Sequence, residues 1–289
     1  MGPWIGNTPS GSTDEADRLV AVLARRRGRR GSAKASTAGR ISDELVAMGD
    51  AAVPALVKRL DVLGDAGCAA LARIGPRAFP ALVEQLRVGS ARRRCLAARA
   101  LELTAFAAAV SPLRYALLDR DPAVRAAAQH ALEGLAKTWV RRLREGDRRD
   151  EAVRVLTAVG EPAVWPLAHV LHDRYVGLFA ARILGQIGEP AVRATLLVLA
   201  QARRSPGHED WAPAFANATL ALADIGAPAL DQVLCLLRDE QELANVRRGA
   251  VHVLGRMGSI ATPHLVAAMQ DADPSVREAA AAALARLTA

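Results

Sequence analysis

Two histidines three positions apart are the residues whose types and spacing come nearest to those of a catalytic or metal site. His169 and His172 are followed by Asp173, and a spacing of three puts both imidazoles on one face of a helix. Imidazole and carboxylate groups bind zinc or transfer protons. Zinc would need further ligands, but the other histidines stand in different predicted helices or in a loop: His130, His208, His252 and His264. The pattern therefore predicts a polar surface with no metal and no cofactor.

Common catalytic signatures are absent from the sequence. It contains no HExxH, GxxxxGK(S/T), GxGxxG or GxSxG segment, whose residues bind zinc, hold phosphates or activate a serine. The three cysteines, Cys68, Cys95 and Cys235, form no CxxC pair, so neither a disulfide framework nor a zinc site is predicted. We predict no catalytic residue and favour a protein that is not an enzyme, with enzymatic activity left open.

Arginine is the other residue type with chemistry of its own. Lys and Arg total 38 against 30 Asp and Glu, which gives a net charge of +8. Basic clusters at residues 25–30, 92–94 and 141–149 have the charge that meets phosphates. A nucleic-acid groove also needs aromatic stacking partners, and aromatic residues make up only 3% of the chain. We expect at most weak, salt-dependent, non-specific nucleic-acid binding, dominated by residues 25–30.

The composition is that of a helical, globular, cytoplasmic protein. Hydrophobic residues are 51% and charged residues 24%, near globular averages, and the abundant alanine and leucine favour helix. Apolar runs fall short of the roughly 18 residues that a membrane span needs. Residues 1–12 lack the charged and apolar regions of a signal peptide. The sequence therefore predicts a reduced, cytoplasmic chain with no membrane segment.

An internal repeat predicts the elements that position these residues. Six segments place a leucine four residues before a glycine: Leu45-Val-Ala-Met-Gly49, Leu71-Ala-Arg-Ile-Gly75, Leu156-Thr-Ala-Val-Gly160, Leu184-Gly-Gln-Ile-Gly188, Leu222-Ala-Asp-Ile-Gly226 and Leu254-Gly-Arg-Met-Gly258. A second apolar stretch with an early proline follows, as in Ala52-Val-Pro-Ala-Leu56. Leu101, Leu132 and Leu284 hold the leucine place in degenerate copies. The steps of about 30 residues are typical of stacked helical hairpins.

Each repeat unit reads as helix, glycine stop, helix. Glycine can take the left-handed conformation that ends the first helix, and proline near the start of the second loses no helical hydrogen bond. One hairpin cannot bury its apolar face, so neighbouring repeats must stack. The sequence thus predicts an all-α solenoid, a right-handed superhelix of about eight to nine hairpins over residues 40–289. It is preceded by a flexible tail (1–13), a capping helix with a basic end (14–30) and a flexible linker (31–39).

Two segments carry a resemblance to a known family. Asp121-Pro-Ala-Val-Arg125 and Asp273-Pro-Ser-Val-Arg277 resemble the turn and first helix of HEAT repeats, of the short bacterial type known as phycobilisome-lyase HEAT-like repeats. The resemblance implies that Asp121, Arg125, Asp273 and Arg277 are structural and tie adjacent repeats together. The same arginine place is kept at Arg94, Arg149 and Arg247 and lost at Gly64, Gly177 and Phe215. Where it is lost, we expect repeats to be held by packing alone.

The resemblance implies several classes of function. Such solenoids serve as scaffolds, regulators, lyases and, in some cases, nucleic-acid enzymes. We favour a non-catalytic protein-protein interaction scaffold or adaptor whose protein partner binds on the concave face. The alternatives are a nucleic-acid-binding protein and a chromophore lyase or other HEAT-like enzyme, with Cys235 as the residue to suspect. Deoxyhypusine hydroxylase uses repeated His-Glu pairs for iron, whereas this chain has only His208-Glu209, so we predict that it is not that enzyme.

The partner site is predicted from the second helices, which line the concave side of such a solenoid. Positions nine and twelve after each glycine, or after the residue in its place, form a ladder of mixed sign. In its middle the ladder combines a tyrosine, an arginine and two histidines: Tyr115, Arg148, His169 and His172. Tyrosine and arginine are enriched among residues that dominate binding energies. We therefore predict the partner-binding strip at these four residues, with the loop at residues 203–210 at its edge.

Overall fold

The chain is an all-α solenoid. The computed structural model describes residues 10–26, 32–146, 148–204 and 211–288, and these ranges contain helices and turns but no strand. The chain divides into two compact units, Met1–Leu135 and Ala136–Ala289. The division falls within one long helix, α9, which therefore contributes residues to both units.

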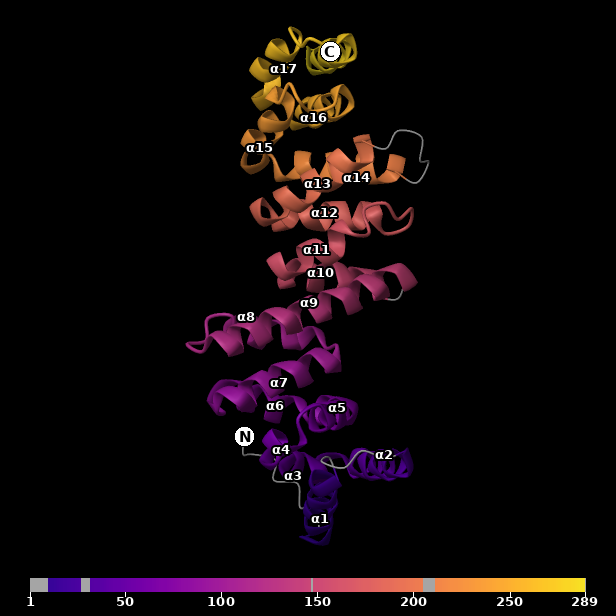
Figure 1. Cartoon of the computed structure of the whole chain (residues 1–289), viewed down its shortest axis with the longest axis vertical. Helices are drawn as coiled ribbons and strands as arrows, with labels where there is room; N and C mark the ends of the chain where they lie inside the picture. The colour runs from indigo at the N-terminus through magenta and orange to yellow at the C-terminus, as the bar shows by residue number, and fades with distance from the viewer. Residues whose placement is uncertain (1–9, 27–31, 147, 205–210, 289) are drawn as a thin grey trace, which may run out of the picture. The chain divides into compact units, whose positions relative to one another are not determined.

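The helices follow one another in short pairs (Figure 1). The helices up to α9 are α1 (Ser10–Arg26), α2 (Ser32–Ala47), α3 (Val53–Lys58), α4 (Leu60–Leu63), α5 (Asp65–Ile74), α6 (Phe79–Val88), α7 (Ala91–Thr104), α8 (Val110–Ala116) and α9 (Pro122–Glu145). Those that follow are α10 (Arg149–Val159), α11 (Val164–Ala168), α12 (Gly177–Ile187), α13 (Val192–Arg204), α14 (Trp211–Ile225), α15 (Ala227–Arg238), α16 (Ala244–Met257), α17 (Thr262–Ala268) and α18 (Pro274–Thr288). Short 3-10 turns join most pairs: η1 (Gly49–Ala52), η2 (Gly75–Arg77), η3 (Ala107–Ala109), η4 (Glu161–Ala163), η5 (Glu189–Ala191) and η6 (Gly258–Ala261).

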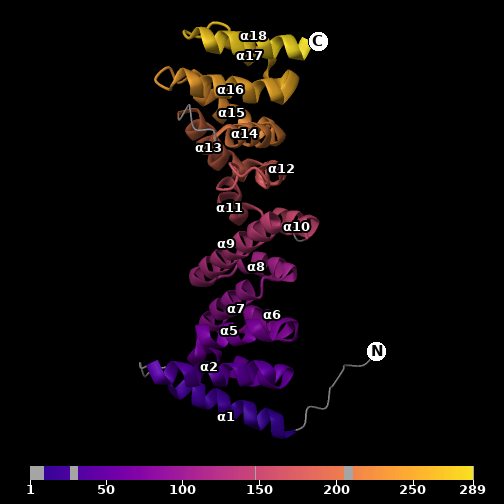
Figure 2. The same ribbon diagram turned by 90° about the vertical axis from the view of Figure 1, so that its right-hand side faces the viewer.

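First helices pack on first helices, and second helices on second helices. In the unit that ends at Ala289, α10 contacts α12, α12 contacts α14, α14 contacts α16 and α16 contacts α18, while α11 contacts α13 and α13 contacts α15. Figure 2 shows α16, α17 and α18 stacked in this way. The leucines that mark the repeats are fully buried at Leu45, Leu71, Leu101, Leu132, Leu156, Leu184, Leu222 and Leu254. Leu284 is only half-buried in the last described helix, so the core consists of the interfaces between repeats.

The glycine stops have positive φ, as predicted, but a different ψ. Gly160 and Gly188 have φ/ψ of 74/−134° and 81/−140°. A left-handed helical residue has a ψ of about +47°, so the prediction is correct for φ and wrong for ψ. Glycine without Cβ adopts this region readily. The amide of Gly188 still donates to the Leu184 carbonyl at 3.1 Å, and η5 begins directly after it. The helix is thus closed, and the chain turns at once into the second helix.

Of the three repeats that lack the glycine, the two at Leu101 and Leu132 behave differently. Ala105, four residues after Leu101, ends α7 in the left-handed conformation with φ 53° and ψ 29°. Thr104 supports this end, because its hydroxyl donates to the Leu101 carbonyl at 2.7 Å and accepts the Phe106 amide at 3.3 Å. At the equivalent Ala136 there is no stop, and α9 continues for 24 residues. In the described ranges, seven of the nine leucine-bearing helices have a second helix, and α9 and α18 do not.

The contrast predicts opposite effects of glycine at these two positions. Ala105→Gly should raise the free energy of unfolding by about 1 kcal/mol, because a residue with Cβ costs roughly 1–2 kcal/mol in the left-handed region. Ala136→Gly should lower it by about 1 kcal/mol, because glycine is unfavourable inside a helix. Urea denaturation of the two variants measures both changes, and a loss of stability in Ala105→Gly would contradict the assignment.

Where a flexible linker was expected at residues 31–39, the described residues 32–39 are helical. The first helix, α1, occupies Ser10–Arg26, and α2 begins at Ser32 and contacts α1. The segment contains three alanines and a lysine, which favour helix. One internal glycine, Gly39, has no atom within 4 Å of an added Cβ. Most of the expected tail (1–9) and residues 27–31 lie outside the described residues.

Candidate partner-binding grooves

Two buried ion pairs join consecutive repeats. Arg94 on α7 contacts Asp119 after α8, with Nε to Oδ2 at 2.8 Å. Arg247 on α16 donates to both carboxylate oxygens of Asp271 after α17, at 3.0 and 2.9 Å. Both guanidinium groups are buried, and each also donates to a backbone carbonyl before its own helix, Gly89 and Glu242 respectively. Burial and the paired geometry make these stronger connections than surface ion pairs.

The four residues assigned to the inter-repeat turns lie beside these pairs. Asp121 and Asp273 accept the amides of Ala123 and Ser275, both at 2.8 Å, and so begin α9 and α18 as helix caps. Arg125 donates to the carbonyls of Asp119 and Arg120 at 2.9 and 3.2 Å. Arg277 makes the equivalent contacts with the carbonyls of Asp271 and Ala272 at 2.7 and 2.9 Å. Their effect on stability stays a prediction.

The ion pairs that cross to the next repeat involve a different aspartate from the one expected. Asp119 and Asp271 stand two positions before the capping aspartates. Each also accepts the amide of its capping aspartate, at 2.8 and 2.9 Å. Neither aspartate was predicted from the sequence, although Arg94 and Arg247 were assigned to the recurring arginine place. The recurring Asp-x-Asp-Pro pattern was the available signal.

Two of the three repeats without the arginine, those at Gly64 and Gly177, are not held by packing alone. At Gly177, Asn217 of α14 donates to the Leu171 carbonyl at 2.8 Å, and a Cβ at residue 177 would collide with that amide. At the Gly64 repeat, Arg93 contacts Asp61 at 2.6 Å and the Lys58 carbonyl at 3.0 Å. Polar bonds to turn carbonyls thus recur with different donors.

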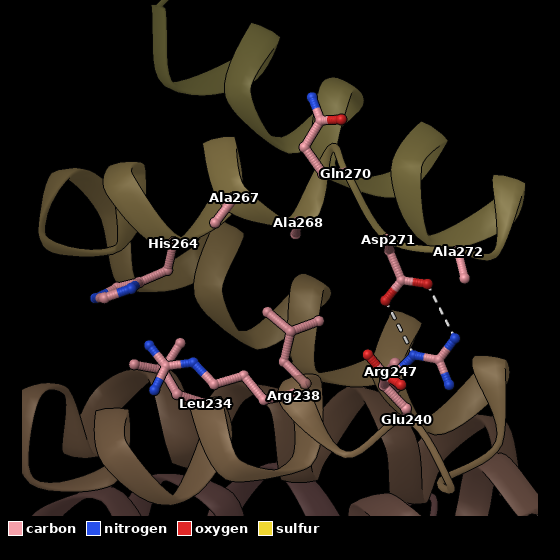
Figure 3. A pocket seen from close by; sticks show the side chains of 11 residues that line it. Leu234, Arg238, Glu240, Arg247, His264, Ala267, Ala268, Gln270, Asp271 and Ala272 are labelled. Atoms are coloured by element: carbon pink, nitrogen blue, oxygen red, sulfur yellow. Dashed lines mark hydrogen bonds and ion pairs between the residues drawn. The ribbon is translucent and has the colours of Figure 1, made fainter.

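One groove lies between α15 and α17 and has the Arg247–Asp271 pair on one side (Figure 3). Its cavity volume is about 470 Å³. Arg238 and His264 contribute polar groups, Glu240 lies near Arg247, and Ala267 and Gln270 line the wall. We call it the Arg238 groove. Both signs of charge are present, and the two leucines that line it, Leu234 and Leu237, are buried.

An equivalent groove, the Tyr115 groove, lies between α6 and α8. Arg94 and Asp119 line it, as Arg247 and Asp271 line the Arg238 groove, and its volume is about 680 Å³. Tyr115 and Leu118 line it too and are 74% and 81% exposed. The predicted site residue Tyr115 therefore occupies an open groove, as a partner-binding residue must.

His169 and His172 line a third groove, between α11 and α13. This His169 groove has a volume of about 630 Å³, and its other lining residues are mostly apolar, with Trp165 and Leu197 among them. The His169 Nδ1 lies 2.7 Å from the Trp165 carbonyl oxygen, and since a carbonyl only accepts, Nδ1 carries the proton. The second nitrogen, Nε2, is then the basic atom of the neutral ring.

Asp173 does not form a site with these histidines. Its carboxylate pairs with Arg144 at 2.9 Å and accepts the amides of Tyr175 and Val176 at 2.8 and 3.1 Å. Burial acts to raise the pKa of Asp173, but the two amides and the Arg144 cation outweigh it and lower the pKa. The aspartate is thus an ionised group that holds the turn before α12.

Arg148 is not part of a second helix, and its assignment to the ladder is wrong. It lies in the turn between α9 and α10 with φ 50° and ψ 45°, and its guanidinium is 3.4 Å from Glu151. The ladder assumed a glycine-type stop near Ala136, but α9 continues to Glu145. Tyr115 also belongs to a different compact unit from His169 and His172. The structure describes Tyr115 in one groove and the two histidines in another, each within its own unit, and their role in partner binding stays a prediction.

The ion pairs give stability a defined pH dependence. Hydrogen bonds from Arg94 and Arg247 lower the pKa values of Asp119 and Asp271. A carboxylate whose pKa is lowered by folding stabilises the protein fully above its unfolded pKa of about 3.9, and the contribution is lost as the pH falls through the folded value. We expect the urea concentration at the unfolding midpoint to decrease as the pH is lowered below about 4. This decrease should be smaller in the double variant Asp119→Asn/Asp271→Asn. Equal pH dependence in both proteins would contradict this origin.

Other expected features fall partly outside the described residues. Most of the basic cluster at 25–30 and the His208-Glu209 pair lie there. Within the described ranges, no group of three or more His, Cys, Asp or Glu residues is arranged to hold a metal ion. Among the helices of these ranges, none has the length and apolar character to cross a membrane. Cys235, suspected for a lyase, is exposed on α15.

Comparison with known proteins supports the HEAT-repeat family. Residues 206–285 match the family model described as HEAT repeats. No curated protein matches the chain. Similar solved structures include human deoxyhypusine hydroxylase in complex with glycerol, 20% identical over 96% of this chain and 97% of that chain, with a TM-score of 0.34. An engineered protein is 18% identical over 99% and 97% of the two chains, with a TM-score of 0.33. Kap121p is 14% identical over 96% of this chain but 38% of its own length, with a TM-score of 0.39.

Proposed function

We propose that this chain, a solenoid of HEAT-like repeats, is a non-catalytic scaffold. It would bind a protein partner through the grooves between its second helices. Helical-repeat solenoids commonly present such extended surfaces to partners. One observation carries the proposal: large apolar side chains are exposed where grooves form. Tyr115 and Leu118 lie in one groove and Trp165 and Leu197 in another. Exposed apolar groups gathered in a concavity mark interaction sites.

The proposal assigns partner contact to Tyr115, His169 and His172. Tyrosine has a large apolar body and a polar tip, which suits it to interfaces. The histidines border an apolar wall that includes Trp165 and Leu197. Arg148 has no such setting and is left out of the proposed surface.

The test is affinity capture from a lysate of the native cell, followed by mass spectrometry. The bait proteins are the wild type, Tyr115→Ala, Trp165→Ala and, as a matched control, Tyr175→Ala. Tyr175 is 73% exposed, almost the same as Tyr115, but it lines none of the three grooves. We expect a protein captured by wild type and Tyr175→Ala but lost with one groove variant. Capture of nucleic acid alone, or equal capture by all four baits, would overturn the proposal.

A further inference from the structure

The Tyr115 groove combines exposed apolar groups with two arginines that form no ion pair among the described residues. Val88, Tyr115 and Leu118 are all exposed along it. Arg87 and Arg120 also line it and are exposed, and neither forms an ion pair within the described part of the chain. The one acidic lining residue, Asp119, is bound to Arg94. The groove therefore has an uncompensated positive charge beside an apolar surface.

The Arg238 groove shows which of these features the repeat itself requires. Both grooves have a buried Arg–Asp pair. Both also have an arginine near the end of the helix that forms one wall, Arg87 on α6 or Arg238 on α15. The places of Tyr115, Leu118 and Arg120 are taken in the Arg238 groove by Ala267, Gln270 and Ala272. That groove also includes Glu240. Two aligned grooves of one fold thus differ in charge and apolar character, so neither property of the Tyr115 groove follows from repeat packing.

We propose that the Tyr115 groove binds an acidic linear peptide segment in which a large apolar side chain is flanked by carboxylates. This inference rests on the scaffold function proposed above. Tyr115 and Leu118 would contact the apolar side chain, since aromatic residues dominate binding energies in such pockets. Arg87 and Arg120 would pair with the flanking carboxylates, for which the planar guanidinium has the right geometry.

The same side chains fit a nucleic acid less well. A strand would need a succession of cations along its backbone and aromatic faces for its bases. The groove contains one aromatic residue, Tyr115, and its other exposed apolar residues are the aliphatic Val88 and Leu118. Aliphatic side chains have no face on which a base stacks, whereas they pack well against a leucine or phenylalanine.

Fluorescence anisotropy with designed peptides tests the proposal. The probe is a labelled peptide of about ten residues with a central Leu-Phe flanked by glutamates. One comparison peptide replaces the glutamates by lysines, and another replaces Leu-Phe by Ser-Ser. We expect the acidic, apolar probe to bind at least about tenfold more tightly than either comparison peptide, because charge and apolar contact are both required.

Variants locate the binding to the groove. Tyr115→Ser/Leu118→Ser and Arg87→Glu/Arg120→Glu should each weaken probe binding at least about tenfold. The matched charge control is Arg182→Glu/Arg256→Glu, which changes the net charge equally at exposed positions on the first helices α12 and α16. It should change the dissociation constant by less than about twofold. Circular dichroism confirms that every variant is folded.

Three results would overturn the proposal. One is equal affinity for the three peptides, and another is an equal loss in the charge control and in Arg87→Glu/Arg120→Glu. The third is binding of a labelled DNA duplex that competes with the probe and is stronger than it. If the probe fails while a captured protein still depends on Tyr115, the scaffold function stands and the acidic-peptide class is wrong. If capture is also independent of Tyr115 and Trp165, both proposals fail.

Discussion

Replacing Arg247 by alanine should lower the free energy of unfolding by about 3–5 kcal/mol, because removal of one partner leaves a buried charge uncompensated. Its guanidinium donates to both oxygens of Asp271 and to the Glu242 carbonyl, and both side chains are about nine-tenths buried. Arg277→Ala is the matched comparison. Arg277 contacts only backbone carbonyls, so we expect a loss of about 1–3 kcal/mol there and in Arg125→Ala.

A double-mutant cycle separates the ion pair from general loss of packing. Arg247→Ala, Asp271→Ala and the double variant are compared by urea denaturation. The double variant should be more stable than the sum of the single losses implies, because it removes both buried charges together. Strict additivity of the two single changes would show that the pair does not connect the repeats energetically. A loss below about 0.5 kcal/mol for Arg247→Ala would place it among ordinary surface arginines.

Trp139→Ala should lower the free energy of unfolding by a similar amount, but for a different reason. Trp139 is 1% exposed, and the Arg142 guanidinium lies 4.5 Å from its ring centroid. Truncation of a buried tryptophan leaves a large cavity and costs about 3–5 kcal/mol. Trp165→Ala is the control, because Trp165 is 51% exposed in the His169 groove. Its loss of stability should stay below about 1 kcal/mol.

Thermal and urea unfolding of the two tryptophan variants measure this difference. The outcome also bears on the capture experiment, since Trp165→Ala can be interpreted there only if the variant is as stable as the wild type. Equal destabilisation by Trp139→Ala and Trp165→Ala would mean that Trp165 is part of the core and not of a partner surface.

The repeat pattern predicts most of the fold because it combines two independent physical signals. Buried leucines and glycine stops recur together, and both are needed to build a hairpin. Where glycine is missing, the outcome depends on neighbouring residues. Thr104 and Phe106 end α7 after Ala105 through local hydrogen bonds. After Ala136, Trp139, Val140 and Leu143 are buried in their turn, and this helical spacing continues α9. The apolar periodicity was readable, but a stop at every leucine place was assumed.

The candidate site was less predictable than the fold. Tyr115, His169 and His172 were assigned to second helices and are exposed, but only Tyr115 lies in one, α8, whereas His169 and His172 lie in the turn just after α11. Arg148 was misplaced because α9 has no glycine-type stop near Ala136. Asp119 and Asp271 were missed because their partners, Arg94 and Arg247, are about 25 residues away in sequence. Leu118 lies in the turn after α8, and its exposure depends on the backbone conformation of that turn. Helical periodicity does not specify this conformation.

The polar bonds that bridge neighbouring repeats differ in strength from one junction to the next, and this has a mechanical consequence. Each repeat touches only its neighbours, so a chain stretched from its ends yields at one junction after another. The junction bridged by Asn217 has a single neutral bond to the Leu171 carbonyl. Those bridged by Arg94 and Arg247 have buried, charge-assisted bonds to Asp119 and Asp271. Under load, these polar bridges are therefore unequal, since those of Arg94 and Arg247 must release charged groups and that of Asn217 only a neutral amide.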